Sequence, residues 1–280
     1  MGWPRHRSLV VGVVVVAVAI PVVLGMMLAS PAGQTWSDAV LGAVREVEWL
    51  PRWLLRGGLR WLATPFVVVV VAWTFVRMLR AGRRRAATIA FAVSVGSFLA
   101  SEAIKLGLLP FPAFGSDATH DLSGHVAMVA AALVVVVVAA PPRSRPKVLA
   151  SAWLLMLGTG IGVVVAGWHD GGEVVVPMAI SIAWTVAGSA VTGWAVASRR
   201  GAPAREAGRW RWWQLAPWAL TLGCAAAVTV LVIGAGGTTG PVAPLLAVAL
   251  AAAAGSTALA QAAHALAAAL DDPVPAGRAS

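Results

Sequence analysis

Charged residues are scarce in this chain. Of its 280 residues only 11% are charged and 59% are hydrophobic, whereas a soluble domain carries about 25% charged residues. This composition excludes an ordinary soluble protein. Tyrosine is absent, although the chain has 14 tryptophans. The single cysteine, Cys224, excludes an intrachain disulfide and leaves the redox compartment open.

Acidic residues are also few, since 11 Asp+Glu stand against 21 Lys+Arg and the formal net charge is +10. A strongly basic chain is often a nucleic-acid-binding protein. Here, however, the basic residues form short clusters between long apolar runs. That distribution is typical of membrane orientation, so we expect membrane lipids and no nucleic acid as partners.

Long apolar runs are what the sequence has in abundance. A hydrocarbon core of about 30 Å is crossed by about 20 apolar residues in a helix. Eight runs approach this length, and they cover residues 9–28, 61–76, 86–108, 123–140, 148–168, 174–197, 215–235 and 242–270. Some are rich in valine, but a helix satisfies its own backbone groups in lipid and an open strand does not. The sequence therefore predicts an all-α, polytopic transmembrane helix bundle with about eight spans.

The basic residues indicate the orientation of these spans. With a cytoplasmic amino terminus, 16 of the 21 basic residues fall on the cytoplasmic side. The five that fall outside are Arg45, Arg52, Arg56, Arg60 and Lys105. The positive-inside rule then favours a multi-pass plasma membrane protein with both termini in the cytoplasm. The first run is longer than the apolar part of a cleaved signal, which favours a retained anchor.

The chain divides into three regions on this reading. Residues 1–85 hold two spans and an outer segment with arginines and tryptophans, residues 86–198 hold most of the candidate site, and residues 199–280 hold a basic loop, two spans and a short tail from Asp271. Small residues at 234–237 and 251–254 allow close helix approach. We therefore expect the C-terminal helices to serve packing or homo-oligomer formation, and His264 to pack between helices.

Three of the five histidines fall at one predicted face of the membrane. They are His120, His125 and His169, and the ionisable residues near them are Glu102, Lys105, Asp117, Asp121, Asp170 and Glu173. Ionisable groups at the edge of the hydrocarbon are costly. This cluster is therefore a candidate functional site on the non-cytoplasmic side, and the alternative is that these loops are simply polar.

Spacing suggests what the cluster can do. His169 and Glu173 are four residues apart, so a helix would let the carboxylate bind one imidazole nitrogen and leave the other for nucleophilic or basic chemistry. Ser123 and Gly124 precede His125 at a predicted helix start, which can hold an anionic oxygen. Lys105 adds a positive charge. Two histidines, a cation and an anion pocket favour phosphoryl transfer.

At these residues the sequence resembles the type 2 phosphatidic acid phosphatase superfamily of integral-membrane lipid phosphatases. That family carries the motifs K-x6-R-P, P-S-G-H and S-R-x5-H-x3-D, and the likeness covers about residues 86–197. The resemblance implies a six-helix core followed here by two C-terminal helices, with no metal or other cofactor. It implies that Lys105 binds phosphate, that Ser123 and Gly124 contact it, that His125 is the general acid and that His169 is the nucleophile. Glu173 stands at the place of the family's aspartate.

The sequence departs from the motifs at several positions. Phe111-Pro112 stands one residue early in place of Arg-Pro, Leu122 replaces the proline of the second motif, and Gly162-Val163 replaces Ser-Arg. Both motif arginines, which would bind phosphate bidentately, are therefore absent. Arg52, Arg56 and Arg60 share a helical stripe, and they either supply anion binding or extend to lipid headgroups.

The predicted function is hydrolysis of a phosphomonoester or diphosphate of a lipid or isoprenoid at the outer face, through a phosphohistidine. One alternative is a catalytically inactive relative that binds a lipid or polyprenyl phosphate or scaffolds the cell envelope. Another is a divalent metal site formed by His120, Asp121, His125, His169 and Glu173. A transporter is disfavoured because the ionisable residues lie at one face and not at mid-membrane.

Overall fold

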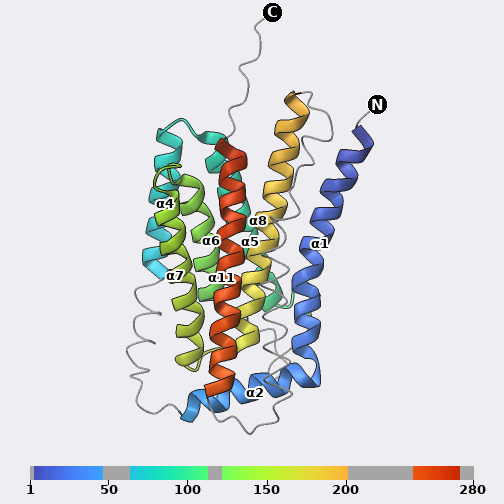
Figure 1. Ribbon diagram of the computed structural model, residues 1–280, viewed down its shortest axis with the longest axis vertical. Coiled ribbons are helices and arrows are strands. Elements are labelled where there is room, and N and C mark those ends of the chain that lie inside the picture. Colours follow the sequence, from blue (N-terminus) through green and yellow to red (C-terminus); the bar gives the residue numbers. More distant parts are fainter. Residues whose placement is uncertain (1–2, 47–63, 113–121, 201–241, 272–280) are drawn as a thin grey trace, which may run out of the picture.

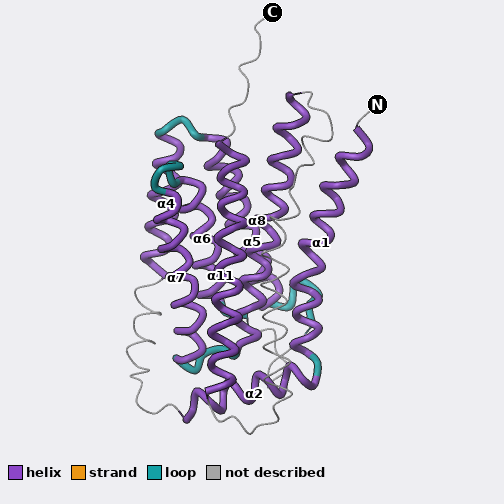
Figure 2. Tube along the Cα trace, viewed as in Figure 1, coloured by secondary structure: helices purple, strands orange, loops and turns teal. Residues whose placement is uncertain are grey.

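The computed structural model describes residues 3–46, 64–112, 122–200 and 242–271. In these residues every regular element is a helix (Figures 1 and 2). The helices are α1 (Trp3–Ala29), α2 (Pro31–Glu46), α4 (Thr64–Arg80), α5 (Arg84–Lys105), α6 (Gly124–Ala139), α7 (Arg145–Val165), α8 (Gly171–Arg200) and α11 (Val242–Asp271). The predicted all-α class is confirmed for this part of the chain.

Several of these helices are long and apolar enough to cross a membrane, as a multi-pass membrane protein requires. Four qualify by length and composition, namely α5, α7, Gly171–Gly193 of α8 and Ala243–Asp271 of α11. A fifth candidate is the pair Val18–Ala29 and Pro31–Glu46, which is bent by 75°. The predicted count of about eight spans is not confirmed, and the run 215–235 lies outside the described residues.

Helix α6 corresponds to the predicted run 123–140, but it is too short to be counted among the four helices that qualify by length. It is apolar but only 16 residues long, which at 1.5 Å per residue gives about 24 Å. It packs against α4, α5, α7, α8 and α11, and most of its residues are buried. A helix that is apolar all round belongs in the core of a bundle. Its valine run, including Val134, Val135, Val137 and Val138, is therefore covered by other helices and not by lipid.

The C-terminal helix α11 belongs to this core. It packs against α8, α7 and α6, and its Leu259 and Leu266 are almost fully buried. The predicted separation of two C-terminal helices from a six-helix core is therefore not confirmed. Ala251 and Ala252 are buried within the molecule. The prediction for His264 is wrong, because this residue lies on the exposed face of α11.

Helix α2 is an element that the apolar runs did not predict. The Ser30 hydroxyl accepts a hydrogen bond from the Gly33 amide at 3.2 Å, and Pro31 occupies the first helical position, which is a favoured start. The helix lies across one end of the bundle (Figure 1). Its buried residues recur at helical spacing and face the bundle. They are Gly33, Trp36, Ser37, Val40, Ala43 and Val44.

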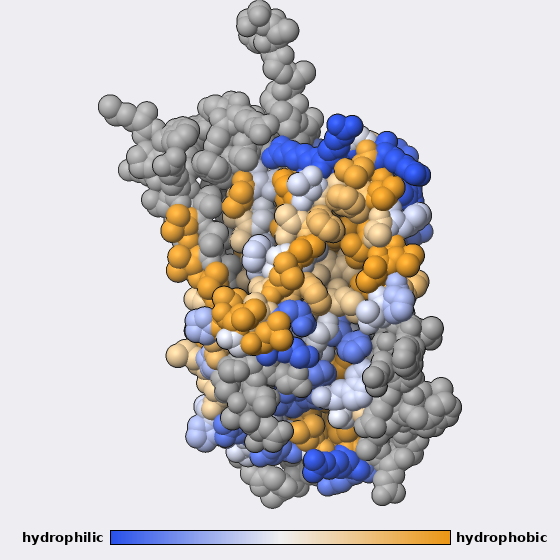
Figure 3. Space-filling model, turned by 180° about the vertical axis from the view of Figure 1, so that it is seen from behind, coloured by the Kyte–Doolittle hydropathy of each residue, from blue (hydrophilic) through white to orange (hydrophobic). Residues whose placement is uncertain are grey.

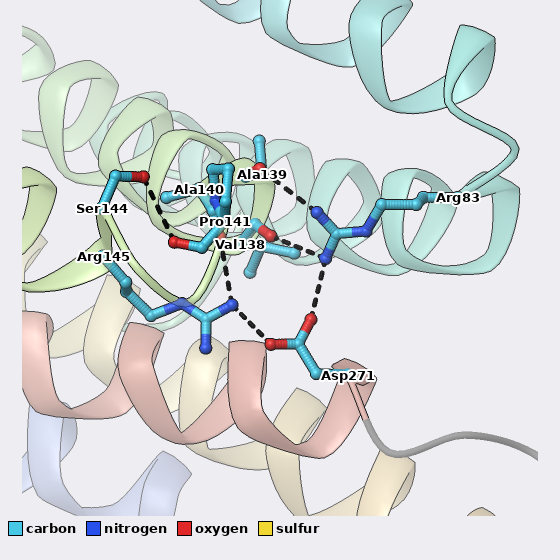
Figure 4. A network of polar contacts seen from close by, with 8 residues as sticks. All are labelled: Arg83, Val138, Ala139, Ala140, Pro141, Ser144, Arg145 and Asp271. Atoms are coloured by element: carbon cyan, nitrogen blue, oxygen red, sulfur yellow. Dashed lines mark hydrogen bonds and ion pairs between the residues drawn. The ribbon is translucent and has the colours of Figure 1, made fainter.

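The opposite end carries an ion-pair network that joins α5, α6, α7 and α11 (Figure 4). Asp271 pairs with Arg83 at 3.0 Å and with Arg145 at 2.6 Å. Arg83 also donates to the carbonyls of Val138 and Ala139, and Arg145 donates to the carbonyl of Ala140. Cations at a helix C-terminus are favourable because carbonyls there lack helical partners. We call the end of the bundle that carries Arg83, Arg145 and Asp271 the arginine end.

The network corrects one prediction. Asp271 was expected to begin a tail, but it is the last residue of α11 and contacts two arginines. A buried arginine needs a carboxylate partner to offset its desolvation, and Arg145 is 5% exposed. The local composition of the tail gave no hint of this, because both partners are distant in sequence.

The bundle therefore has two chemically distinct ends. α5 and α7 begin at the arginine end, where α6 and α11 finish. The start of α1 also lies at this end (Figure 1). Figure 3 shows hydrophilic residues at the upper end, apolar residues below them, and hydrophilic residues again in the lower half. Among the described residues, the basic clusters and the site histidines thus lie at opposite ends, while the side of the membrane that each faces stays a prediction.

Candidate functional site

A pocket of about 550 Å³ opens at the end of the bundle opposite the arginines, where α5 finishes and α6 and α8 begin. Its lining combines ionisable and large apolar side chains, as ligand pockets commonly do. The lining residues are Thr64, Phe98, Glu102, Lys105, Gly124, His125, Met128, Trp168 and His169. Four of the six predicted site residues therefore meet in one cavity, although their helices are far apart in the sequence. We call this end of the bundle the pocket end.

His169 is held by Glu173, as the spacing of four residues predicted. The Nδ1 atom of His169 lies 2.9 Å from Oε2 of Glu173, and His169 is 9% exposed. An ionised carboxylate only accepts hydrogen bonds, so it would pair with a protonated Nδ1 and leave the lone pair of a neutral imidazole on Nε2. This tautomer suits a nucleophile or a base that works through Nε2.

Glu173 also belongs to a capping box at the start of α8. Its Oε2 accepts from the Asp170 amide at 3.1 Å, and Oδ1 of Asp170 accepts from the Glu173 amide at 2.9 Å. Such a reciprocal pair satisfies two amides that have no partner within the helix. Glu173 therefore fixes both the helix start and the imidazole. The carboxylate of Glu173 is therefore explained in part by its role in starting α8, apart from any role in catalysis.

Helix α2 supports this helix start from outside. The Ser37 hydroxyl donates to Oδ2 of Asp170 at 2.6 Å, and Asp170 is 3% exposed. The Trp36 ring lies against Gly171, where any Cβ atom would overlap it. Sequence reasoning missed both α2 residues. The helical spacing of the buried α2 residues was a usable signal for the helix, but not for the bend that brings it to Asp170.

The start of α6 forms another wall of the pocket. Ser123 is fully buried, and its hydroxyl accepts from the Val126 amide at 3.4 Å. Its own amide donates to the Glu173 carbonyl at 2.9 Å, which ties α6 to α8. Ser123 is not among the lining residues, so its predicted contact with phosphate stays a prediction. Gly124 does line the pocket.

Aromatic and acidic side chains complete the cavity. The rings of His125 and Trp168 lie with centroids 5.2 Å apart at 32°, an arrangement that restrains the imidazole. Phe98, Glu102 and Lys105 follow one another along the pocket-facing stripe of α5. Sequence reasoning included Glu102 in the polar cluster but missed Phe98 and Trp168, whose contacts depend on how separate helices pack.

The positions of the missing motif arginines hold apolar packing. Val163 is fully buried in α7, beside the buried Gly162. The Phe111 ring packs against Gly25 of α1, and Leu122 is 1% exposed. Neither arginine position therefore offers a charge to the described pocket.

Some predicted residues lie outside the described part of the chain. These are Asp117, His120, Asp121 and the arginine stripe of Arg52, Arg56 and Arg60. Among the residues that the structure describes, no group of three or more His, Cys, Asp or Glu side chains is arranged to hold a metal ion. The alternative metal site would therefore need ligands from His120 and Asp121, which lie outside the described residues.

The fold and the pocket together define an all-helical, membrane-type bundle with a histidine-containing cavity at one end. Comparisons with family models, with curated proteins and with solved structures give no match. The resemblance to lipid phosphatases therefore rests on the motif residues alone.

Proposed function

We propose that this protein is a diverged relative of the type 2 phosphatidic acid phosphatases and hydrolyses a phosphomonoester or diphosphate of a lipid or isoprenoid. One observation carries the proposal. His169, held through Nδ1 by Glu173, shares a pocket with His125 and Lys105. A fixed imidazole, a second imidazole and a cation are the groups that phosphoryl transfer through a phosphohistidine needs.

The reaction would proceed in two steps. Nε2 of His169 attacks phosphorus while the bond to the leaving oxygen breaks, and His125 gives that oxygen its proton. Water then attacks the phosphohistidine, His125 takes a proton from the water, and the bonding pair returns to the ring of His169. Glu173 stabilises the positive charge that the ring develops, and Lys105 offsets charge on the phosphoryl oxygens.

Location in the membrane follows from the same proposal. The basic clusters favour a cytoplasmic arginine end, and the pocket then faces the non-cytoplasmic side of the plasma membrane. Phe98 and Met128 line the pocket beside the polar groups. They offer apolar contact to the first part of a lipid chain, so membrane lipids bearing phosphate are the substrates this cavity suits best.

Phosphate release from lipid phosphates by the purified full chain in detergent tests this function. We expect release by the wild type and its loss in His169→Ala and His125→Ala. His264→Ala is the matched control, since His264 is exposed on α11 outside the pocket. Equal, near-zero release by the wild type and both pocket variants would refute the enzymatic function. Loss of release in EDTA that zinc restores would refute the metal-independent mechanism.

A second function is favoured by the apolar residues at the arginine positions, of which Val163 is buried and Phe111 is partly buried. Val163 and Phe111 leave Lys105 as the one Lys or Arg among the described lining residues, and bidentate arginines are a main source of transition-state stabilisation for phosphate. A protein that binds a lipid phosphate without hydrolysing it, alone or within a cell-envelope assembly, would fit such a pocket. Saturable binding of a lipid phosphate together with no release would establish this function in place of the first.

A further inference from the structure

Helix α4 carries an exposed stripe that runs from apolar residues to arginines. The helix packs against α6 and α5 and buries Val67, Thr74 and Met78. The side chains of the stripe are exposed and recur three or four residues apart, so they share one face of the helix. They are Phe66, Val69, Trp73, Arg77 and Arg80. We call these five residues the α4 stripe.

The aromatic residue nearest the arginines contacts the first of them. The guanidinium carbon of Arg77 lies 4.8 Å from the centroid of the Trp73 ring, within the range of a cation–π interaction. Trp73 is 59% exposed, and exposed tryptophan beside a cation is typical of a helix at the membrane–water interface. The boundary between the apolar and the cationic part of the stripe is therefore a position for a lipid headgroup.

Positive charge is concentrated where the stripe ends. Five arginines stand within nine residues, at positions 77, 80, 83, 84 and 85, and residues 64–101 contain no Asp or Glu. Among the described residues, the carboxylate that pairs with arginines at this end is that of Asp271, and it contacts Arg83 and Arg145. Helix α5 starts just after the stripe without a side-chain cap, so its N-terminus adds partial positive charge. An anion is consequently favoured beside Arg77 and Arg80.

The length of the stripe matches one leaflet of a bilayer. Phe66 and Arg77 are 11 residues apart on α4, which at 1.5 Å per residue gives about 17 Å. Half of a hydrocarbon core of about 30 Å is about 15 Å. A lipid with its headgroup beside Arg77 could therefore lay an acyl chain along the apolar part of the stripe as far as Phe66.

We propose that the α4 stripe is a binding site for an anionic phospholipid, with the headgroup phosphate at Arg77 and Arg80 and an acyl chain along the apolar part. Guanidinium groups bind phosphate oxygens through paired N–H donors. With the arginine end in the cytoplasm, as the basic clusters favour, the lipid comes from the cytoplasmic leaflet, whose surface is negative. The inference does not rest on the proposed hydrolysis, because it concerns the opposite end of the bundle.

Two lipids with identical acyl chains isolate the contribution of headgroup charge. Phosphatidylglycerol carries a net negative charge, and phosphatidylcholine is zwitterionic. We expect the purified full-length protein in detergent, titrated with each lipid in native mass spectrometry, to bind phosphatidylglycerol about thirtyfold more tightly. This factor is equivalent to about 2 kcal/mol, because each of two cations near an anionic lipid contributes about 1 kcal/mol. Arg77→Gln with Arg80→Gln should abolish the preference.

A variant with the same loss of charge is the matched control. Arg143→Gln with Lys147→Gln also removes two exposed cations at the arginine end, and it should keep the preference because neither residue belongs to the α4 stripe. Inorganic phosphate at the same concentration as the lipid should not displace phosphatidylglycerol, because it makes no contact with the apolar part. Phosphatidylglycerol is a phosphodiester, so the proposed hydrolysis of monoesters or diphosphates would leave it intact.

The outcomes decide between a localised site and a general attraction of the basic end. Equal binding of the two lipids by the wild type, or an unchanged preference in Arg77→Gln with Arg80→Gln, would overturn the proposal. An equal loss of preference in both double variants would show a general attraction and would overturn the localised site. Displacement of the lipid by equimolar phosphate would refute the part of the acyl chain. Phosphate release enters none of these measurements, so failure of the proposed function is distinguishable from failure of this inference.

Discussion

Removal of the Asp271 carboxylate tests how the bundle is held together at the arginine end. In Asp271→Ala, Arg145 keeps its hydrogen bond to the Ala140 carbonyl at 3.1 Å but loses its ion pair at 2.6 Å (Figure 4). Arg83 loses a weaker contact at 3.0 Å and retains its two bonds to carbonyls of α6. The main effect is thus a buried guanidinium without its counter-ion.

The magnitude follows from the burial of each partner. Breaking a buried pair by removing one member costs about 3–5 kcal/mol. The Arg145 side chain is 6% exposed but that of Asp271 is 27% exposed, so the lower limit of about 3 kcal/mol applies. Arg83, at 30% exposure, adds about 0.2–1 kcal/mol at most. Because domains of 150–250 residues lose about 2–4 °C per kcal/mol, a combined loss of about 3–4 kcal/mol should lower the apparent Tm in detergent by roughly 6–16 °C.

Replacing both charges provides the control. Arg145→Met with Asp271→Leu leaves no buried unpaired charge, because Arg83 is partly exposed, so the double variant should recover most of the lost stability. Arg83→Ala alone should cost less than about 1 kcal/mol, because its side chain is partly exposed. An Asp271→Ala protein that melts at the wild-type temperature would refute this reasoning. A double variant that melts as low as Asp271→Ala would refute it as well.

Three further predictions concern the pocket end. Glu173→Gln keeps an oxygen for the capping box but removes the negative charge beside His169. Phosphate release should therefore fall about tenfold or more while Tm stays nearly constant, whereas Glu173→Ala should lower both release and Tm. Equal release by the wild type and Glu173→Gln would contradict the role of the carboxylate. Ser37→Ala removes the hydroxyl that donates to the buried Asp170 and should destabilise the fold by about 1–3 kcal/mol, measured by thermal unfolding. Ser37→Thr keeps a hydroxyl and should lower Tm less. Identical melting of the wild type and both variants would argue against this contact. Gly171→Ala brings a methyl group onto the Trp36 ring and should lower the free energy of unfolding by about 1–3 kcal/mol. Adding Trp36→Leu should restore part of the lost Tm. A Gly171→Ala protein that melts at the wild-type temperature would show that α2 does not pack tightly against α8 at this position.

Helix positions were largely predictable because lipid and burial permit few alternatives. Apolar runs at 86–108, 148–168 and 242–270 correspond to α5, α7 and α11, as expected when each backbone must satisfy its own polar groups. The number of spans was less predictable. A run of apolar residues does not reveal whether lipid or other helices cover it, and α6 is short and enclosed.

The candidate site was predictable where it depends on local spacing. The contact of His169 with Glu173 and the position of Ser123 before α6 both follow from helical geometry. Contacts between distant segments were not predictable in this way. Ser37 and Asp170 are 133 residues apart, and the stack of Trp168 on His125 joins two different helix ends. These contacts depend on the packing of the bundle, which no single window of sequence contains.

The separation of the two polar networks has a consequence for how this architecture can change over evolutionary time. Helix α5 has 22 residues and so extends about 33 Å, with the ion pairs of Arg83, Arg145 and Asp271 near its start and the pocket near its end. Substitutions at such a distance with no shared partner have nearly additive effects on stability. The pocket can therefore exchange its ionisable residues, and with them its ligand, while the opposite end preserves the helix arrangement. One scaffold can thus hold different ligand-binding residues at its pocket end.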